Sequence, residues 1–234
     1  PIDHPRPPVQ SYRGARLDLQ LPAELSGELL QLAQRNGVSL FMLLLASFQA
    51  LLHRYSGQQQ IRVGVPVANR NRVETEGLIG FFVNTQVLQA QVQGQQRFEQ
   101  LLVEVKQAAL AAQAHQDLPF EQLIEALQPE RSLSHSPLFQ VMFNHQANNG
   151  QAQRQSAVQL PQLKVEDIVW EGRTAQYDLT LGTYESSDGI AAELTYATDL
   201  FNATTIERLA RHWQNLLRAI VTDPSQRIGE LPLL

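Results

Sequence analysis

The segment Leu40–Leu52 constrains the fold more than any other part of the sequence. It is apolar on nearly every side and is interrupted only by Ser47 and Gln49. A helix without a polar face must be enclosed by other elements. The stretch is also shorter than the roughly eighteen apolar residues that a membrane-spanning helix needs. We therefore expect a buried, central helix from Leu40 to Tyr55, with Ser39 as its N-cap.

Strand-like and helix-like segments alternate on both sides of that helix. Apolar and polar alternation predicts strands at residues 16–21, 61–67, 81–92, 138–145, 163–170, 176–184 and 189–196. Helical spacing of apolar residues predicts helices at residues 22–36, 97–115, from 119 onward, and 203–220. The turn sequence Ser186–Gly189 indicates a hairpin. Strands mixed with long amphipathic helices favour an α/β sandwich with a mixed sheet.

Both ends of the chain differ from this pattern. Residues 1–13 are rich in proline and show no apolar period, and residues 223–234 begin with a helix-breaking Asp-Pro pair. We expect residues 14–222 to form the folded unit, residues 1–13 to be a linker from an upstream part, and residues 223–234 to begin a downstream linker.

Composition excludes several functional classes. Hydrophobic residues make up 43% of the chain and charged residues 18%, a balance that favours an ordered core over disorder. The formal net charge of −5 argues against binding nucleic acid through its phosphates. The absence of cysteine excludes disulfides and thiolate nucleophiles. The six histidines are dispersed, so no metal site is expected. We expect a cytoplasmic protein that binds no membrane.

Three segments carry unusual polar residues. In the first, Ile79–Gln86, the polar pair Asn84 and Thr85 interrupts an apolar strand. A buried amide needs hydrogen-bond partners, because an unpaired one costs about 1–3 kcal/mol. Two interpretations stay open: Asn84 satisfies a neighbouring loop backbone, or it lines a cavity. Because Phe82, Asn84 and Gln86 share one strand face, we expect that face to be wet or to contact substrate.

The other two segments have simpler interpretations. In His115–Glu121, an acidic residue precedes a proline-initiated helix, which favours helix capping by Asp117 and Glu121 over acid–base chemistry. In Arg131–Leu138, Ser and His are adjacent, but no orienting carboxylate is identifiable. That segment is interpreted as a structural turn.

In this order, the three segments resemble the later core motifs of condensation domains from nonribosomal peptide synthetases. They are similar to the family's I-G-x-F-V-N-T, H-Q-D-x-P-F-E and R-x-x-S-x-x-P-L motifs. Further similarities occur at Pro66–Arg70, Tyr177–Leu179 and Leu200–Phe201. The resemblance covers essentially the whole chain.

The resemblance implies a two-lobed fold like chloramphenicol acetyltransferase, of which this chain is similar to the C-terminal lobe. The family joins an acceptor amine to a donor acyl thioester, both carried on the phosphopantetheine arms of carrier proteins. The family's H-H-x-x-x-D-G motif is missing, since the sequence contains no His-His pair. The isolated chain is therefore expected to be inactive and to bind no cofactor of its own. Its implied partners are the N-terminal lobe, peptidyl carrier proteins and an adjacent adenylation domain.

The resemblance also assigns site residues. It implies a substrate-tunnel wall at Asn84, Thr85 and Gln86, and no catalytic residue in this lobe. It implies a floor loop that contains Arg70, Arg72 and Gly80. It implies a latch that contains Trp170, Tyr177 and Asp178. It implies structural motif residues at His115, Asp117, Pro119, Phe120, Glu121, Arg131, Ser134 and Pro137.

Two alternatives stay open. The chain is the corresponding lobe of an epimerisation, cyclisation or dual epimerising–condensing domain, or it is a binding module that recognises a carrier protein without chemistry. An upstream lobe that bears the H-H-x-x-x-D-G motif would exclude the free-standing module.

Overall fold

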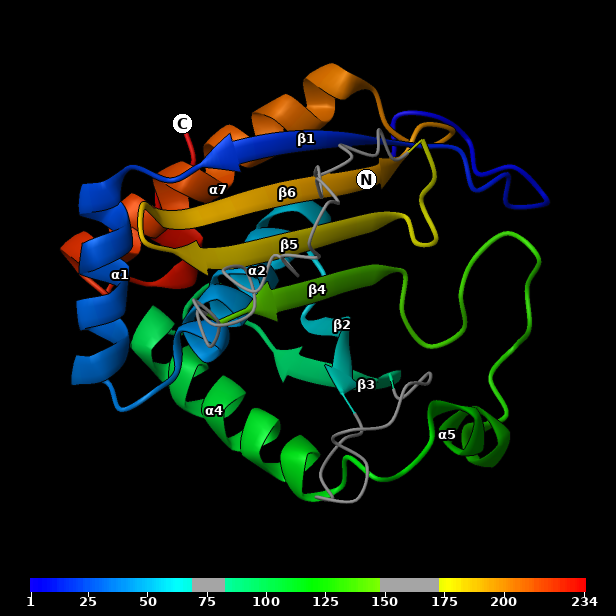
Figure 1. Cartoon of the computed structure of the whole chain (residues 1–234), viewed down its shortest axis with the longest axis horizontal. Coiled ribbons are helices and arrows are strands. Elements are labelled where there is room, and N and C mark those ends of the chain that lie inside the picture. Colours follow the sequence, from blue (N-terminus) through cyan, green and yellow to red (C-terminus); the bar gives the residue numbers. More distant parts are fainter. Residues whose placement is uncertain (69–82, 148–172) are drawn as a thin grey trace, which may run out of the picture.

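The computed structural model describes residues 1–68, 83–147 and 173–234, and it shows a twisted sheet with helices packed on one face (Figure 1). The strands are β1 (Gly14–Gln20), β2 (Gln60–Ala68), β3 (Val83–Gln91), β4 (Val141–Gln146), β5 (Leu179–Ser186) and β6 (Gly189–Ala197). The helices are α1 (Ala23–Arg35), α2 (Leu40–Ser56), α4 (Phe98–Ala114), α5 (Phe120–Leu127), α7 (Ala203–Thr222) and a short 3₁₀ helix, η1 (Ile228–Glu230). Arg70, Arg72, Gly80, Trp170 and the strand expected at 163–170 lie outside the described residues.

The strands form one mixed sheet in the order β1-β6-β5-β4-β2-β3. β4 and β5 are parallel, as are β4 and β2 at their contact between Met142 and Gly64. The other neighbours are antiparallel, including the β5–β6 hairpin, in which Ser186 pairs with Gly189. Gly189 takes the positive φ of 115° that this tight turn requires and that L residues rarely adopt. The predicted hairpin and the mixed sheet are confirmed.

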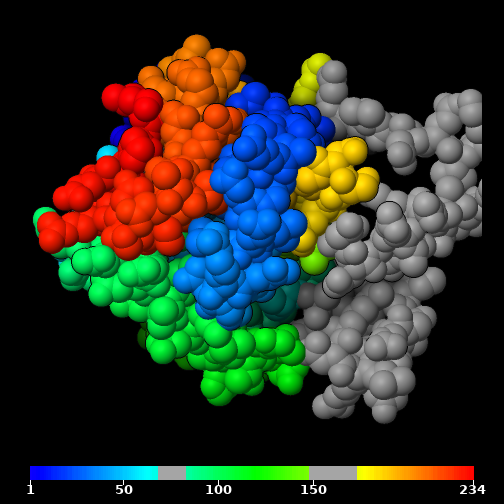
Figure 2. All heavy atoms as spheres, turned by 90° about the vertical axis from the view of Figure 1, so that its left-hand side faces the viewer, coloured from blue at the N-terminus to red at the C-terminus, as the bar shows by residue number. Residues whose placement is uncertain are grey.

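Helix α2 is central, as the apolar run predicted. It packs against β2 and against α1, α4 and α7, and Leu43, Leu44 and Ala46 are fully buried. The Ser39 hydroxyl caps the helix by accepting a hydrogen bond from Met42 N at 3.2 Å. Figure 2 shows α1 in front, with α7 and α4 on either side of it, and α2 contacts all three of these helices.

The two polar residues in this apolar run have partners inside the core. Ser47 accepts a hydrogen bond from the Trp213 indole at 3.0 Å and donates to Leu44 O at 2.6 Å. The Gln49 side chain is satisfied on one atom only: its Nε2 donates to Ile61 O at 3.5 Å and to Leu88 O at 3.3 Å, whereas its buried Oε1 has no hydrogen-bond partner among the described residues. Ser47 therefore avoids the desolvation cost of an unpaired polar group, whereas Gln49 avoids it only for its donor atom.

Strand β4 begins at Val141, three residues later than the alternation predicted. Leu138 has a φ of 67°, a region that a non-glycine residue seldom occupies, and Phe139 N donates to Pro137 O at 2.9 Å. Residues 137–139 therefore form a tight, strained turn, which the apolar pattern alone did not reveal.

Both ends of the chain pack on the folded unit. Residues 3–13 hydrogen-bond to segments near residues 133, 175 and 200. At the other end, Ile228 and Leu231 are buried, and Arg54 donates to both of their carbonyls. The division into linkers 1–13 and 223–234 around a lobe stays a prediction.

Among the described residues, no single helix is long and apolar enough to cross a membrane; α1 and α2 together meet the length and composition test but are bent by 105° at their junction.

Candidate functional site

Asn84 lies near the start of β3 and has backbone partners on both atoms of its amide. Its Oδ1 accepts a hydrogen bond from Phe120 N at 3.0 Å. Its Nδ2 donates to Leu118 O at 2.8 Å and to Gln116 O at 3.3 Å. The side chain is almost completely buried. Asn84 thus holds the segment that leads into α5, which is the first of the two interpretations the sequence left open.

This geometry corrects the expected surroundings of the strand face. Gln86 lies on the same face of β3 and donates to Ala112 O near the end of α4, at 2.6 Å. The backbone around residues 112–120 therefore covers the face at Asn84 and Gln86, which was expected to be wet or to contact substrate. Thr85 points to the other face and is half-buried. The period of the strand was right, but alternation cannot show which neighbouring segment covers a face.

The capping expected for the His115–Glu121 segment comes from a different residue. Helix α5 starts at Phe120, with Pro119 as N-cap residue and no cap from that residue's side chain. Asn84 from β3 accepts the hydrogen bond of Phe120 N instead, so the expectation that Asp117 caps this helix was wrong. Asp117 is exposed, whereas Glu121 lies in the first turn, where the helix dipole favours an acid.

Three aromatic rings connect the motif segments. The Phe139 ring lies 5.7 Å from that of Phe120 in an edge-on arrangement and 5.1 Å from that of Tyr177, centroid to centroid. Phe139 is buried, and burial raises the pKa of the Tyr177 hydroxyl. The ring also covers Gly64 of β2, where any Cβ atom would clash with it. We call Phe120, Phe139 and Tyr177 the aromatic cluster.

Asp178 extends this connection to the N-terminal segment. Arg6 donates to both of its carboxylate oxygens, with Nη1 2.9 Å from Oδ1. The same Nη1 donates to Ser134 O at 3.1 Å. The carboxylate raises the pKa of Arg6 through that bidentate hydrogen bond. Arg6, Ser134 and Asp178, which are distant in the sequence, therefore meet in one region.

The Ser-His pair in Arg131–Leu138 does not form a nucleophile–base arrangement. His135 Nδ1 lies 3.1 Å from the backbone oxygen of Ser136, and the Ser132 and Ser134 hydroxyls bond to each other at 2.7 Å. This supports the interpretation as a structural turn. Arg131 and His115 are exposed.

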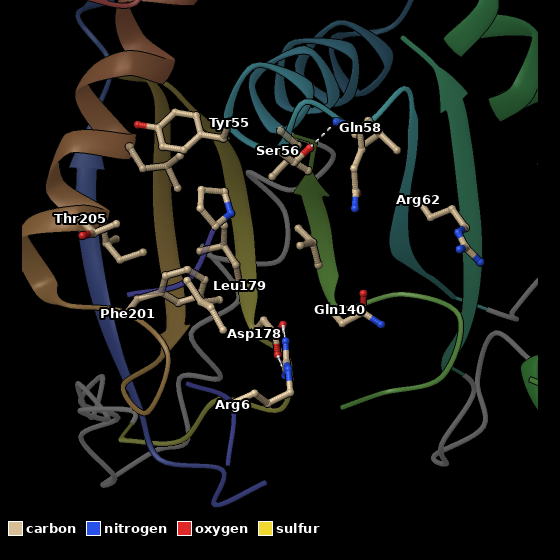
Figure 3. A pocket seen from close by; sticks show the side chains of 17 residues that line it. Arg6, Tyr55, Ser56, Gln58, Arg62, Gln140, Asp178, Leu179, Phe201 and Thr205 are labelled. Carbon is tan, nitrogen blue, oxygen red and sulfur yellow. Dashed lines mark hydrogen bonds and ion pairs between the residues drawn. The ribbon is translucent and has the colours of Figure 1, made fainter. Parts of the chain in front are cut away.

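A cavity of about 330 Å³ lies next to the Arg6–Asp178 pair (Figure 3). Its walls come from α2, the beginning of β2, α7, the beginnings of β4 and β5, and the N-terminal segment. Figure 3 shows the Arg6–Asp178 pair at one end and Tyr55 at the other, with Phe201 and Thr205 along one side. Asn84 does not line this cavity.

Three polar side chains, those of His145, Thr183 and Glu185, meet near the ends of β4 and β5. His145 Nδ1 is 2.7 Å from Thr183 Oγ1, and its Nε2 is 3.0 Å from Glu185 Oε2. Burial lowers the pKa of His145, and the hydrogen bond with Glu185 opposes that shift. The Thr183 side chain is inaccessible and that of His145 is nearly so, whereas Glu185 is partly exposed, and the two hydrogen bonds of His145 join β4 to β5. Within the described residues, no three His, Asp or Glu side chains are grouped as a metal site.

Sequence reasoning missed three residues of this region. Arg6 stands in a segment expected to be a linker, and nothing local marks it. Phe139 follows directly after the third motif. Gly64 did carry a signal, because a glycine inside a strand pattern often marks the close approach of another group.

Comparison with known proteins agrees with the three motifs. The profile of the condensation domain family, described as "Condensation domain", matches residues 1–234. The chain is 43% identical to malpinin synthetase of Mortierella alpina over 234 residues, all of this chain and 3% of that protein. It is 40% identical to tyrocidine synthase 3 of Brevibacillus parabrevis over 234 residues, all of this chain and 4% of that protein.

Solved structures share the fold. The four-domain nonribosomal peptide synthetase holo-AB3403 matches with a TM-score of 0.91 and 28% identity, over 100% of this chain and 18% of that one. The first condensation domain of the CDA synthetase matches with a TM-score of 0.73 and 19% identity, over 95% of this chain and 48% of that one. The predicted fold class, a mixed-sheet α/β fold like that of chloramphenicol acetyltransferase, is confirmed. The chain spans a small part of the curated relatives and about half of that solved domain. From its sequence motifs, its fold and the match along its full length, this chain belongs to the condensation domain family.

Proposed function

We propose that this chain is the C-terminal lobe of a condensation domain that forms amide bonds in nonribosomal peptide synthesis. The observation that carries the proposal is the assembly of the three motif segments into one hydrogen-bonded and aromatic network around Asn84 and Phe139. The match to the family over residues 1–234 supports it independently.

The proposed reaction joins two carrier-bound substrates. The acceptor amine attacks the carbonyl carbon of the donor thioester, so that a C–N bond forms and the C–S bond breaks. The amine loses one proton, and the leaving thiolate of the donor phosphopantetheine arm takes up one. Because the thioester is already activated, holding amine and carbonyl in contact supplies much of the rate. No residue of this lobe is proposed to transfer the proton, because the sequence lacks the family's histidine pair.

The partners follow from this role. They are the N-terminal lobe of the same domain, peptidyl carrier proteins that present the two arms, and an adjacent adenylation domain. The floor loop with Arg70, Arg72 and Gly80 and the latch with Trp170, Tyr177 and Asp178 are proposed to contact the N-terminal lobe.

The role of the tunnel-wall residues is proposed in a modified form. Asn84, Thr85 and Gln86 remain candidates for the wall near the reacting centre. Since both amide atoms of Asn84 already have backbone partners, we propose that Asn84 contributes by holding residues 116–120 in place. The exposed neighbour Val83 and the half-buried Thr85 lie on the opposite face of β3.

The test compares three proteins on the same loaded carriers: the intact two-lobed domain, the same domain with the histidine pair replaced, and this chain alone. Donor and acceptor carrier proteins are loaded, and the dipeptidyl thioester is quantified by mass spectrometry. We expect product from the intact domain only. Product from this chain alone would contradict the expected inactivity. Carrier binding by the intact domain without any amide would favour the binding module, and an inverted donor centre without an amide would favour an epimerisation domain.

A further inference from the structure

The N-terminal segment is attached to the folded unit at several points along its length. Asp3 N and His4 N both donate to Leu200 O, and Gln10 N donates to Leu133 O. Ala175 N donates to Tyr12 O at 2.9 Å. Leu200 follows β6, Ala175 precedes β5, and Leu133 lies within the third motif segment. Figure 1 shows the N-terminal segment beside the ends of β5 and β6.

Arg6 joins the N-terminal segment both to the turn at residues 134–139 and to Asp178, the residue before β5. It bonds to the Asp178 carboxylate through both terminal nitrogens and to Ser134 O through one of them. The two ionised side chains are 25% and 12% exposed, so water screens them less than a surface pair. Bidentate, charge-assisted hydrogen bonds of this kind fix orientation as well as distance.

The turn that Arg6 holds is strained. Leu138 occupies the left-handed region at a φ of 67°, and such residues persist only where the surrounding structure fixes them. On one side of the turn, Arg6 holds Ser134 O. On the other side, the Phe139 ring is wedged over Gly64. Asp178 N also donates to Gln140 O at 3.0 Å, so the pair is linked to both sides of the turn.

We propose that Arg6 is a positioning residue for the condensation site, acting through Asp178 and the turn at 134–139. The turn places Phe139, Phe139 packs against Phe120, and the backbone N–H of Phe120 donates to Asn84. Removing Arg6 releases the turn and loosens the start of α5. This inference rests on the proposed function for its catalytic consequence, but its structural part holds or fails on this chain alone.

Arg13 provides a matched control. It belongs to the same segment and also pairs with a carboxylate, that of Asp199, at 3.0 Å. Its side chain is 73% exposed, and its partner lies in the turn between β6 and α7 rather than in a motif segment. Arg13→Met and Arg6→Met therefore remove the same kind of group from the same segment.

The first experiment measures hydrogen exchange of this chain. In Arg6→Met, we expect the amides of Phe139, Asp178 and Phe120 to exchange at least about tenfold faster, which is the effect of losing a charge-assisted hydrogen bond. We expect the amides of α7 to be unchanged, and Arg13→Met to leave all of these amides at the wild-type rate. Arg6→Lys, which keeps the charge without the bidentate geometry, should lie between wild type and Arg6→Met. If Arg6→Met fails to fold, Arg6→Lys decides, and equal exchange in Arg6→Lys and wild type would overturn the proposal.

The second experiment measures single-turnover amide formation by the intact domain that contains this chain. Arg6→Met should lower the rate while the KM for the acceptor carrier stays unchanged, and its effect should be non-additive with that of Asn84→Ala, because both act on the same segment. Additive effects, or equal rates in Arg6→Met and Arg13→Met, would overturn the proposal. If the wild-type domain makes no amide, the proposed function fails, and the exchange data still decide whether Arg6 holds the turn.

Discussion

Asn84 occupies a position in β3 where its polar side chain is buried and both atoms of its amide have hydrogen-bond partners. One amide caps a helix that begins thirty-six residues later and ties down two carbonyls in the segment before it. Because α5 has no cap from its own N-cap side chain, the first turn of that helix depends on a residue from another element. The sequence showed that Asn84 needed partners, but the identity of those partners depends on the path of the chain between β3 and α5.

Replacing Asn84 by Ala should destabilise the folded chain. Phe120 N and the carbonyls of Gln116 and Leu118 would lose their partner, and we expect a loss of about 1–3 kcal/mol in the free energy of unfolding. Gln89→Ala is the matched control, because Gln89 is an exposed amide on the same strand. Urea denaturation of both variants checks the prediction, and equal midpoints would show that the Asn84 amide is not a structural support.

His145 should make stability depend on pH. Burial lowers its pKa in the folded chain, so the unfolded chain binds more protons between the two pKa values. The stabilising contribution of neutral His145 is therefore fully present above about pH 6.5 and declines as pH falls toward the lower, folded pKa. His145→Gln should flatten the decline in stability below about pH 6.5. Unfolding curves between about pH 5 and pH 8 measure this slope, and an unchanged slope would contradict the assignment.

At the scale of elements, the sequence predicted most helices and strands because their apolar periods are long. Helix α7 was predicted at 203–220 and spans Ala203–Thr222. The start of β4 was missed for a physical reason. The apolar residues Leu138 and Phe139 fit the start of a strand, but Leu138 takes a φ of 67° and the Phe139 ring covers Gly64 of β2. The spacing of apolar residues shows neither the turn nor the contact with another strand.

The contact between Phe139 and Gly64 leads to a prediction for β2. In Gly64→Ala, the new methyl group would clash with the ring atoms of Phe139, and we expect a loss of about 1–3 kcal/mol from the overpacking. Gly27→Ala is the opposite case, because Gly27 lies in α1 with no atom within 4 Å of the new methyl. That change should add roughly 0.5–1 kcal/mol. Thermal unfolding of both variants checks the pair, and a stable Gly64→Ala variant would show that the ring can move aside.

On the scale of the whole molecule, the order of the strands was beyond the reach of the sequence. β1 pairs with β6, and the β2–β3 pair lies at the other end of the sheet beyond β4. β1 and β6 are far apart in the chain, as are β2 and β4, so no local pattern specifies either pairing. The family resemblance supplied the fold class and the set of motif residues. It could not supply the contacts that join those residues, such as Arg6 with Asp178, because one partner lies outside every motif.

Whether the folded unit includes residues 223–234 can be tested by mutation. They were expected to begin a linker, yet Ile228 is completely buried and its backbone pairs with the segment before α4, where Ile228 N donates to Gln96 O at 2.8 Å.

Ile228→Ala removes part of a core side chain, and we expect a loss of about 2–5 kcal/mol in the free energy of unfolding. Leu234→Ala is the control, because Leu234 is fully exposed at the terminus and should change stability by less than about 0.5 kcal/mol. Both are measured by guanidinium denaturation with the slope and midpoint fitted together. A single transition that shifts to lower denaturant in Ile228→Ala alone would show that residues 228–231 unfold with the sheet, as one cooperative unit. Equal midpoints for the two variants would mean that this end of the chain detaches before the core unfolds, as a linker does.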